Sequence, residues 1–375
     1  MWFLQVNTFV GIFAIGLVLM ITGLFSRIST RVRVAMLALM CTAFIGWVDL
    51  WLLGFYVVYI AAVFLLSYII YKVKKAKFFI FVLGIIGCLA PLVFVRSFPH
   101  IHFIVVIGLA FAVLRGIDAL FYTYYTGERV DFLAFYVFMV FVPTFTAGPV
   151  FRYRDFTRAC ENLAKVTLID FIESVKRIIR GLFKIIVVVH LIMQVFEHFL
   201  DGAINPPISV LLVICSYLIL YFNLDGYTDI AIALGRFCGF VVPENFKKPW
   251  RAASFTQFWR SWHSTVSDWI REHVFIFLHN KKLNKWQTAG VVVVVMAVMG
   301  LWHDFSLHVV LVATFYLGGL LAIETVLGLT APKKTWSITR VSRCIAVNFL
   351  FGINTLLFIT DFQSVQTIVR GFFRL

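Results

Sequence analysis

Two Trp-His dipeptides contain the residues of this chain best suited to chemistry. Trp262-His263 lies in a polar, tryptophan-rich segment, and Trp302-His303 ends a strongly apolar one. Imidazole is the side chain best suited to take a proton near neutral pH, and an ionisable group at membrane depth is by default a functional candidate. His303 and His263 are therefore the candidate catalytic residues, and Trp302, Trp262 and Arg260 lie close to them in the sequence.

Acidic residues in a second apolar segment form another candidate group. Asp225, Asp229 and Arg236 are spaced to share one side of a helix, with Tyr227 close by. Asp225, Tyr227 and Asp229 are further candidates for lining a cavity. The same pattern is also typical of a structural polar seam, or of ion coupling in a transporter.

Two other observations limit the chemistry. Arg115 and Asp118 lie three residues apart in an apolar segment, which favours an internal ion pair that fixes helix packing. The sequence contains no H-E-x-x-H pair, no G-x-S-x-G elbow and no P-loop. We therefore expect no metal site, and any catalysis depends on histidine.

The composition is that of a membrane protein. Of 375 residues, 62% are hydrophobic and 14% are charged, whereas soluble domains average about 25% charged. Spans of about 20 apolar residues cross a bilayer. The candidate spans are 6–25, 34–52, 53–71, 78–95, 101–125, 132–150, 182–200, 207–224, 288–302, 306–328 and 341–360. The predicted fold is all-α and polytopic, with about ten to eleven transmembrane or re-entrant helices in one domain, 1–375.

The net charge of +15 comes from short basic clusters between these segments. That distribution follows the positive-inside rule and favours contact with anionic lipids over nucleic acid, while docking of an acidic soluble partner stays open. It predicts an extracytoplasmic N-terminus. The first segment has no basic region or cleavage site and is expected to stay as an uncleaved span.

Two regions break the pattern of membrane helices. Residues 141–156 contain Pro143, Gly148 and Pro149 and predict a re-entrant element. Residues 243–273 are too polar to span. At helical spacing one face of this region is apolar, which predicts an amphipathic interfacial helix. That face comprises Phe255, Phe258, Trp259, Trp262, Val266, Trp269 and Ile270.

Asp304 directly follows His303 in the sequence GLWHDFSLH. Neighbouring residues on a helix do not face one another, so Asp304 is a poor partner for the imidazole ring. We expect a helix to end at His303 and another to begin at Phe305, with Asp304 as its N-cap.

Three motifs resemble those of the membrane-bound O-acyltransferase (MBOAT) family. They are PENFKKPWRAASFTQFWRSWHST with the later GLWHD, VPTFTAGPVFRYRDF, and NLDGYTDIAIALGRFCGF. The likeness covers a core of about 141–325. It is similar to the bacterial branch that contains alginate O-acetyltransferases and the D-alanyl transfer proteins of teichoic acid modification. Asp304 departs from the glycine usual after the second histidine, and Val142 replaces a usual phenylalanine.

The resemblance implies acyl transfer from a thioester to a hydroxyl inside a central tunnel. His303 would act as general base, and His263 would orient the thioester or stabilise the oxyanion. The resemblance also implies that Trp302, Trp262 and Arg260 line the substrate path. The implied donor is acyl-CoA or a small acidic phosphopantetheinyl carrier protein, with no bound cofactor. The implied acceptor is an envelope glycopolymer or an accessory transfer protein beyond the bacterial plasma membrane. D-alanyl and acetyl transfer both stay open, as do a transporter or flippase and an inactive scaffold.

Overall fold

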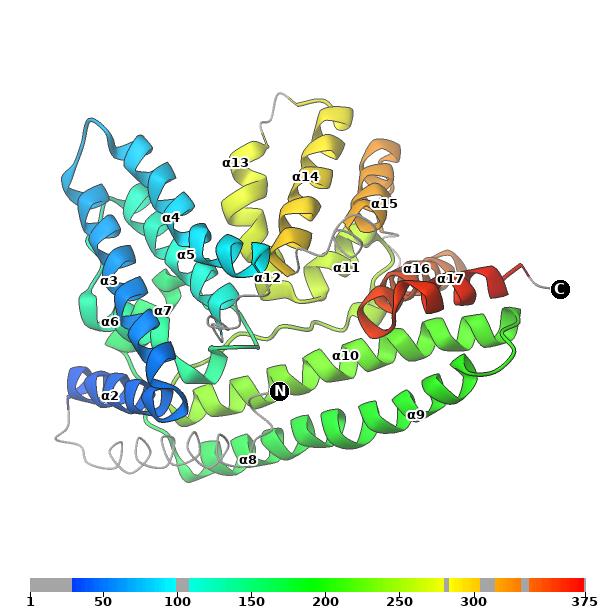
Figure 1. Ribbon diagram of the computed structural model, residues 1–375, viewed down its shortest axis with the longest axis horizontal. Coiled ribbons are helices and arrows are strands. Elements are labelled where there is room, and N and C mark those ends of the chain that lie inside the picture. The colour runs from blue at the N-terminus through cyan, green and yellow to red at the C-terminus, as the bar shows by residue number, and fades with distance from the viewer. Residues whose placement is uncertain (1–28, 99–107, 280–282, 304–313, 332–336, 374–375) are drawn as a thin grey trace. The chain divides into compact units, whose positions relative to one another are not determined.

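A computed structural model describes residues 29–98, 108–279, 283–303, 314–331 and 337–373 (Figure 1). Within these ranges the regular elements are all helices, and no strand occurs. The predicted all-α class is confirmed. The predicted first span, 6–25, lies outside the described residues, as does the proposed cap at Asp304.

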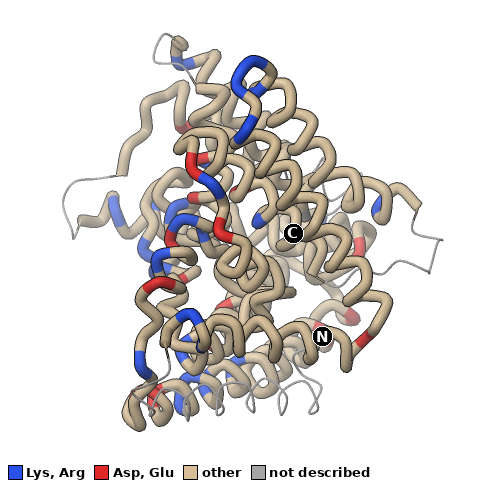
Figure 2. Tube along the Cα trace, turned by 90° about the vertical axis from the view of Figure 1, so that its left-hand side faces the viewer, with Lys and Arg blue, Asp and Glu red and all other residues tan. Residues whose placement is uncertain are grey.

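Seven of the described helices are long and apolar enough to cross a membrane. They are Thr30–Val48, Leu50–Lys72, Lys77–Ser97, Leu168–Leu200, Pro206–Phe237, Lys285–Trp302 and Ile338–Ile359. Figure 2 shows long uncharged stretches of chain with charges in short groups between them. The predicted span at 132–150 is wrong, because α6 (Phe132–Val140) ends before Pro143. The described part of 306–328 is a shorter apolar helix, α15 (Thr314–Leu327).

The chain folds as two compact units. The first comprises Met1–Ile179 and Thr228–Pro243. Its helices are α2 (Thr30–Val48), α3 (Leu50–Lys72), α4 (Lys77–Ser97), α5 (Leu109–Thr126), α6, the 3₁₀ turn η3 (Val142–Thr144), α7 (Tyr153–Glu161), most of α8 (Leu168–Leu182) and the end of α10 (Pro206–Phe237).

Arg115, on α5, explains how the first unit accommodates the break after α6. Its guanidinium donates to the carbonyls of Phe138 at 2.9 Å and Met139 at 3.1 Å, and to the hydroxyl of Thr144 at 2.8 Å. These carbonyls would otherwise lack partners at a helix end. Asp118 accepts the backbone N–H of Tyr153 at 2.5 Å. Both side chains hold the buried, irregular segment after α6, and its re-entrant character stays a prediction.

The second unit comprises Arg180–Tyr227 and Glu244–Leu375. Its elements are most of α10, the π-helices η4 (Phe183–Val188) and η6 (Arg271–Phe275), the 3₁₀ turn η5 (Pro249–Arg251), α9 (Val189–Leu200), α11 (Phe255–Ser261), α12 (Ser264–Ile270), α13 (Ile276–Leu278), α14 (Lys285–His303), α15, α16 (Ile338–Ile359) and α17 (Phe362–Gly371). One apolar core joins α9, α10, α16 and α17 through Phe196, Leu212, Leu356 and Ile368.

Candidate active site

The Trp262-His263 dipeptide lies at a break between two short helices of the second unit. α11 ends at Ser261, and α12 begins at Ser264. His263 has φ 46° and ψ 47°, a left-handed conformation that costs a residue with a Cβ about 1–2 kcal/mol. The single interfacial helix predicted across this segment is therefore wrong.

The preceding loop holds the backbone on both sides of His263. The N–H of Lys247 donates to the carbonyl of Ser261 at 2.8 Å, and the N–H of Ser264 donates to the carbonyl of Asn245 at 2.7 Å. These bonds engage groups that a continuous helix would pair internally. The break is thus imposed by chain that lies before α11 in the sequence.

Asn245 completes this arrangement with its side chain. The buried amide oxygen accepts the N–H of Thr265 at 3.3 Å and its hydroxyl at 2.8 Å, so Asn245 supplies a cap to α12. The sequence does not indicate this role. The only local signal is that asparagine is a favoured capping residue, because the helix that it caps lies 20 residues further along the chain.

Most of the apolar face of this segment packs inside the protein. Trp262 is 4% exposed, and its ring lies 4.7 Å from that of Phe351 and 5.5 Å from that of Phe258, centroid to centroid. Val266 and Trp269 are also buried. Hence the structure places Trp262 in an aromatic core. His263 is 8% exposed, with its ring 6.2 Å from that of Phe246.

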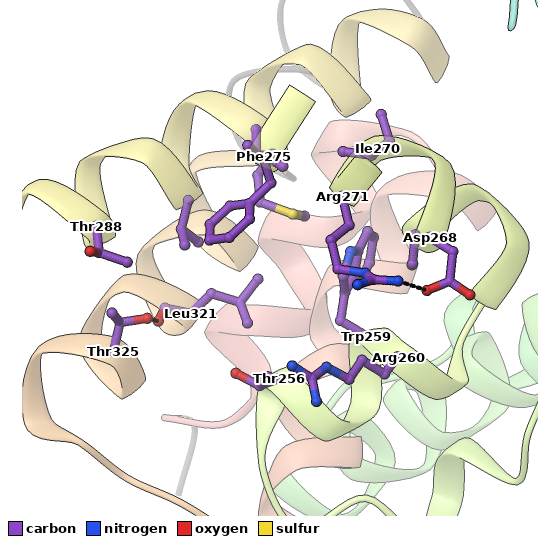
Figure 3. Close-up of a pocket in the computed structure, with 14 residues that line it drawn as sticks. Thr256, Trp259, Arg260, Asp268, Ile270, Arg271, Phe275, Thr288, Leu321 and Thr325 are labelled. Atoms are coloured by element: carbon purple, nitrogen blue, oxygen red, sulfur yellow. Dashed lines mark hydrogen bonds and ion pairs between the residues drawn. The ribbon is translucent and has the colours of Figure 1, made fainter. Parts of the chain in front are cut away.

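A pocket of about 250 Å³ opens between α11, α12, η6, α14 and α15 (Figure 3). Arg260 and Arg271 lie on one side of it, where Arg271 pairs with Asp268 at 3.1 Å. Within the described residues, Arg260 forms no ion pair. Most of the wall is apolar, and it includes Ile270, Phe275, Val292, Val295, Met296 and Leu321. His263 and Trp262 are not among the lining residues, so the structure groups Arg260 with this pocket and apart from the dipeptide.

The acidic residues of α10 each face a basic partner. In the first unit, Asp229 lies 2.8 Å from Arg177. In the second, Asp225 lies 2.5 Å from Nζ of Lys184, on the π-helix η4. Tyr227, between them in the sequence, is buried. Pairing of each carboxylate with a basic side chain favours the structural polar seam among the alternatives for these residues.

Arg236 continues this pattern at the end of α10. Its guanidinium donates to Oδ1 of Asp170 at 2.6 Å, within the first unit. Asp170, Arg177 and Lys184 follow one another at intervals of seven residues, which keeps them on one helical face. The sequence indicated Asp225 and Asp229 as polar residues of α10, but not their partners Lys184 and Arg177.

The second dipeptide is described only in part. α14 ends at His303, whose side chain lies outside the described residues, and Trp302 is half-buried. The interpretation of Asp304 as a helix cap also falls outside them. Among the residues that the structure describes, no group of three or more His, Cys, Asp or Glu side chains is arranged to hold a metal ion.

The family follows from comparison with known proteins. Residues 102–360 match the model of the membrane-bound O-acyltransferase family, MBOAT. The chain belongs to this family. The match includes both Trp-His dipeptides, the irregular segment after α6 and the seam of α10, as the motifs predicted.

Three bacterial relatives illustrate the breadth of the MBOAT family. A probable alginate O-acetylase AlgI of Azotobacter vinelandii is 32% identical over 64% of this chain and 48% of its own. A teichoic acid D-alanyltransferase of Streptococcus thermophilus is 26% identical over 71% of this chain and 69% of its own. A peptidoglycan O-acetyltransferase of Helicobacter pylori is 30% identical over 51% of this chain and 36% of its own. The chain thus spans about half the length of the alginate relatives, and similarity to both predicted kinds of relative is confirmed.

Proposed function

We propose that this MBOAT protein is an O-acyltransferase of the bacterial plasma membrane. It transfers a small acyl group from a cytoplasmic thioester to a hydroxyl of an envelope glycopolymer or of an accessory transfer protein. The observation that carries the proposal is His263, a buried imidazole held in a strained backbone conformation within a family motif. Strain of this kind persists only where surrounding structure enforces it, and it is concentrated at functional sites.

His303 is the general base in this mechanism. It takes the proton of the acceptor hydroxyl while the oxygen attacks the thioester carbonyl, a step worth about 10²–10⁴-fold in rate. The tetrahedral intermediate then expels the thiolate, which takes the proton from the imidazolium, and an ester remains. His263 donates a hydrogen bond to the carbonyl oxygen as its negative charge develops.

The pocket beside α11 suits the donor. Acyl-CoA and phosphopantetheine combine phosphate groups with a long and mostly uncharged arm. The guanidinium groups of Arg260 and Arg271 are suited to pair with phosphate, and the apolar wall suits the arm. Thr288 and Thr325, which also line the pocket, lie towards the ends of α14 and α15 that adjoin basic loops, the expected cytoplasmic side.

The test is acyl transfer by the purified protein in liposomes, with acetyl and D-alanyl thioesters each offered to alginate, teichoic acid and peptidoglycan acceptors. We expect transfer with one pairing, and a loss of at least about 100-fold for His303→Ala. His190→Ala, at an exposed histidine on α9, is the matched control and should retain activity. Equal transfer by the His303→Ala and wild-type proteins would contradict the proposal.

A further inference from the structure

Glu324 is a buried carboxylate in the otherwise apolar helix α15, and it is 7% exposed. Its Oε2 accepts the backbone N–H of Phe255 at 2.5 Å, and its Oε1 accepts that of Thr256 at 3.0 Å. Both donors lie in the first turn of α11. Burying a carboxylate is costly unless hydrogen bonds compensate it, and these two N–H groups supply that compensation.

The two hydrogen bonds complete the capping of α11. The first N–H groups of a helix have no partner within it, and they attract negative charge. Glu324 accepts hydrogen bonds from the first two N–H groups of α11. The hydroxyl oxygen of Ser254 accepts one from the third, the N–H of Gln257, at 3.1 Å. α11 has seven residues and leads directly to His263, so its N-terminal anchor sets the position of its end.

Glu324 belongs to a helix that is itself packed closely on α14. A Cβ added to Gly318 of α15 would lie 3.5 Å from the Cα of Val293, which shows how near the two backbones come. α14 ends at His303. A continuous set of contacts therefore leads from the segment of His263, through Glu324 and α15, to the helix of His303.

We propose that Glu324 is a positioning residue, which fixes His263 relative to the end of α14. This inference rests on the acyl transfer proposed above. Glu324 also fixes one pocket wall against another, because Thr256 and Arg260 of α11 face the pocket with Leu321 and Thr325 of α15 (Figure 3). Loss of the carboxylate is then expected to affect both catalysis and donor binding, but not binding of the acceptor.

The test variant is Glu324→Gln, which keeps the shape of the side chain but places an amide NH₂ against a backbone donor. Misplacement by 1 Å can cost about 100-fold in rate, and we expect kcat per folded molecule to fall by about tenfold or more. The KM for the thioester should rise, whereas the KM for the acceptor should stay unchanged. Hydrogen exchange in a peptide covering 252–262 should become faster, because one of the two backbone N–H groups loses its acceptor and the other keeps only a neutral amide oxygen.

Asp361→Asn is the matched control, since it makes the same chemical change at a carboxylate that caps α17 through the N–H of Ser364 at 3.0 Å. It should leave kcat and exchange in 252–262 unchanged. Faster exchange in Glu324→Gln with an unchanged kcat would overturn the positioning role, and so would an equal loss of kcat in both variants. If the wild-type protein transfers no acyl group, the proposed function fails first; an active wild type with an equally active Glu324→Gln variant contradicts this inference alone.

Discussion

The side-chain amide oxygen of Asn245 accepts the hydroxyl of Thr265 at 2.8 Å and thereby ties the loop before α11 to the helix after His263. The backbone carbonyl of Asn245 accepts the N–H of Ser264 as well, at 2.7 Å. One residue thus holds the start of α12 with two acceptors. The break that contains His263 depends on this contact between residues that are far apart in sequence.

The first prediction concerns this contact. Asn245→Ala should lower the free energy of unfolding by about 1–3 kcal/mol, because buried donors of Thr265 lose their partner. It should also reduce acyl transfer per folded molecule, since His263 is no longer held. Thermal unfolding and transfer assays of the purified protein measure the two effects.

Asn205→Ala is the control for that variant, because Asn205 caps α10 through the N–H of Ile208 at 3.1 Å at an exposed site. It should lower stability by about 0.5–2 kcal/mol and leave transfer per folded molecule unchanged. Full transfer in Asn245→Ala would show that the cap is dispensable for the site.

The second prediction separates the backbone of His263 from its imidazole. Glycine adopts positive φ without the penalty of a Cβ, so His263→Gly should be more stable than His263→Ala by about 1 kcal/mol. Both variants lack the ring and should lose transfer to a similar extent. The measurements are thermal unfolding and initial rates with the thioester. Retained transfer in His263→Gly would mean that the position serves only the turn.

The third prediction concerns Lys184 and Asp225. Their side chains are 18% and 17% exposed. Removing one partner of a fully buried pair costs about 3–5 kcal/mol, and a smaller loss of stability is expected for this partly buried pair. Asp225→Leu should therefore reduce the yield of folded protein, and Lys184→Met combined with Asp225→Leu should restore it. Because we assign the pair to the structural seam, the double variant should transfer acyl groups normally. A folded but inactive double variant would instead identify the carboxylate as a substrate contact.

The fourth prediction concerns close packing against α10 in the second unit. A Cβ at Gly226 would lie 2.6 Å from Cγ1 of Ile185 and 2.9 Å from the carbonyl oxygen of Gly181. Gly226→Ala should thus lower the free energy of unfolding by about 1–3 kcal/mol. The measurement is the fall in melting temperature of the protein in detergent. Gly290→Ala, where no atom lies within 4 Å of the added Cβ, should be neutral or stabilising by up to about 1 kcal/mol.

The sequence by itself determined those features that depend on local composition and spacing. Apolar runs of sufficient length predicted five of the seven long helices closely. They predicted only the second half of Leu168–Leu200 and only the first part of Pro206–Phe237. Pro143 and Gly148 predicted the irregular segment, since neither residue type supports a regular helix interior. The Trp-His dipeptides with their flanking motifs were enough to indicate the family.

Only the tertiary structure decided how the polar groups are paired. The helical spacing of Asp225 and Asp229 says nothing about Lys184 and Arg177, which come from another helix. The helical spacing of apolar residues predicted one continuous helix through His263. That spacing contains no information about the hydrogen bonds that Asn245 forms with the residues after His263. Glu324 was equally hidden, since its partners are backbone groups more than 60 residues away. Local propensity is encoded in neighbouring residues, whereas these contacts exist only after distant segments have packed together.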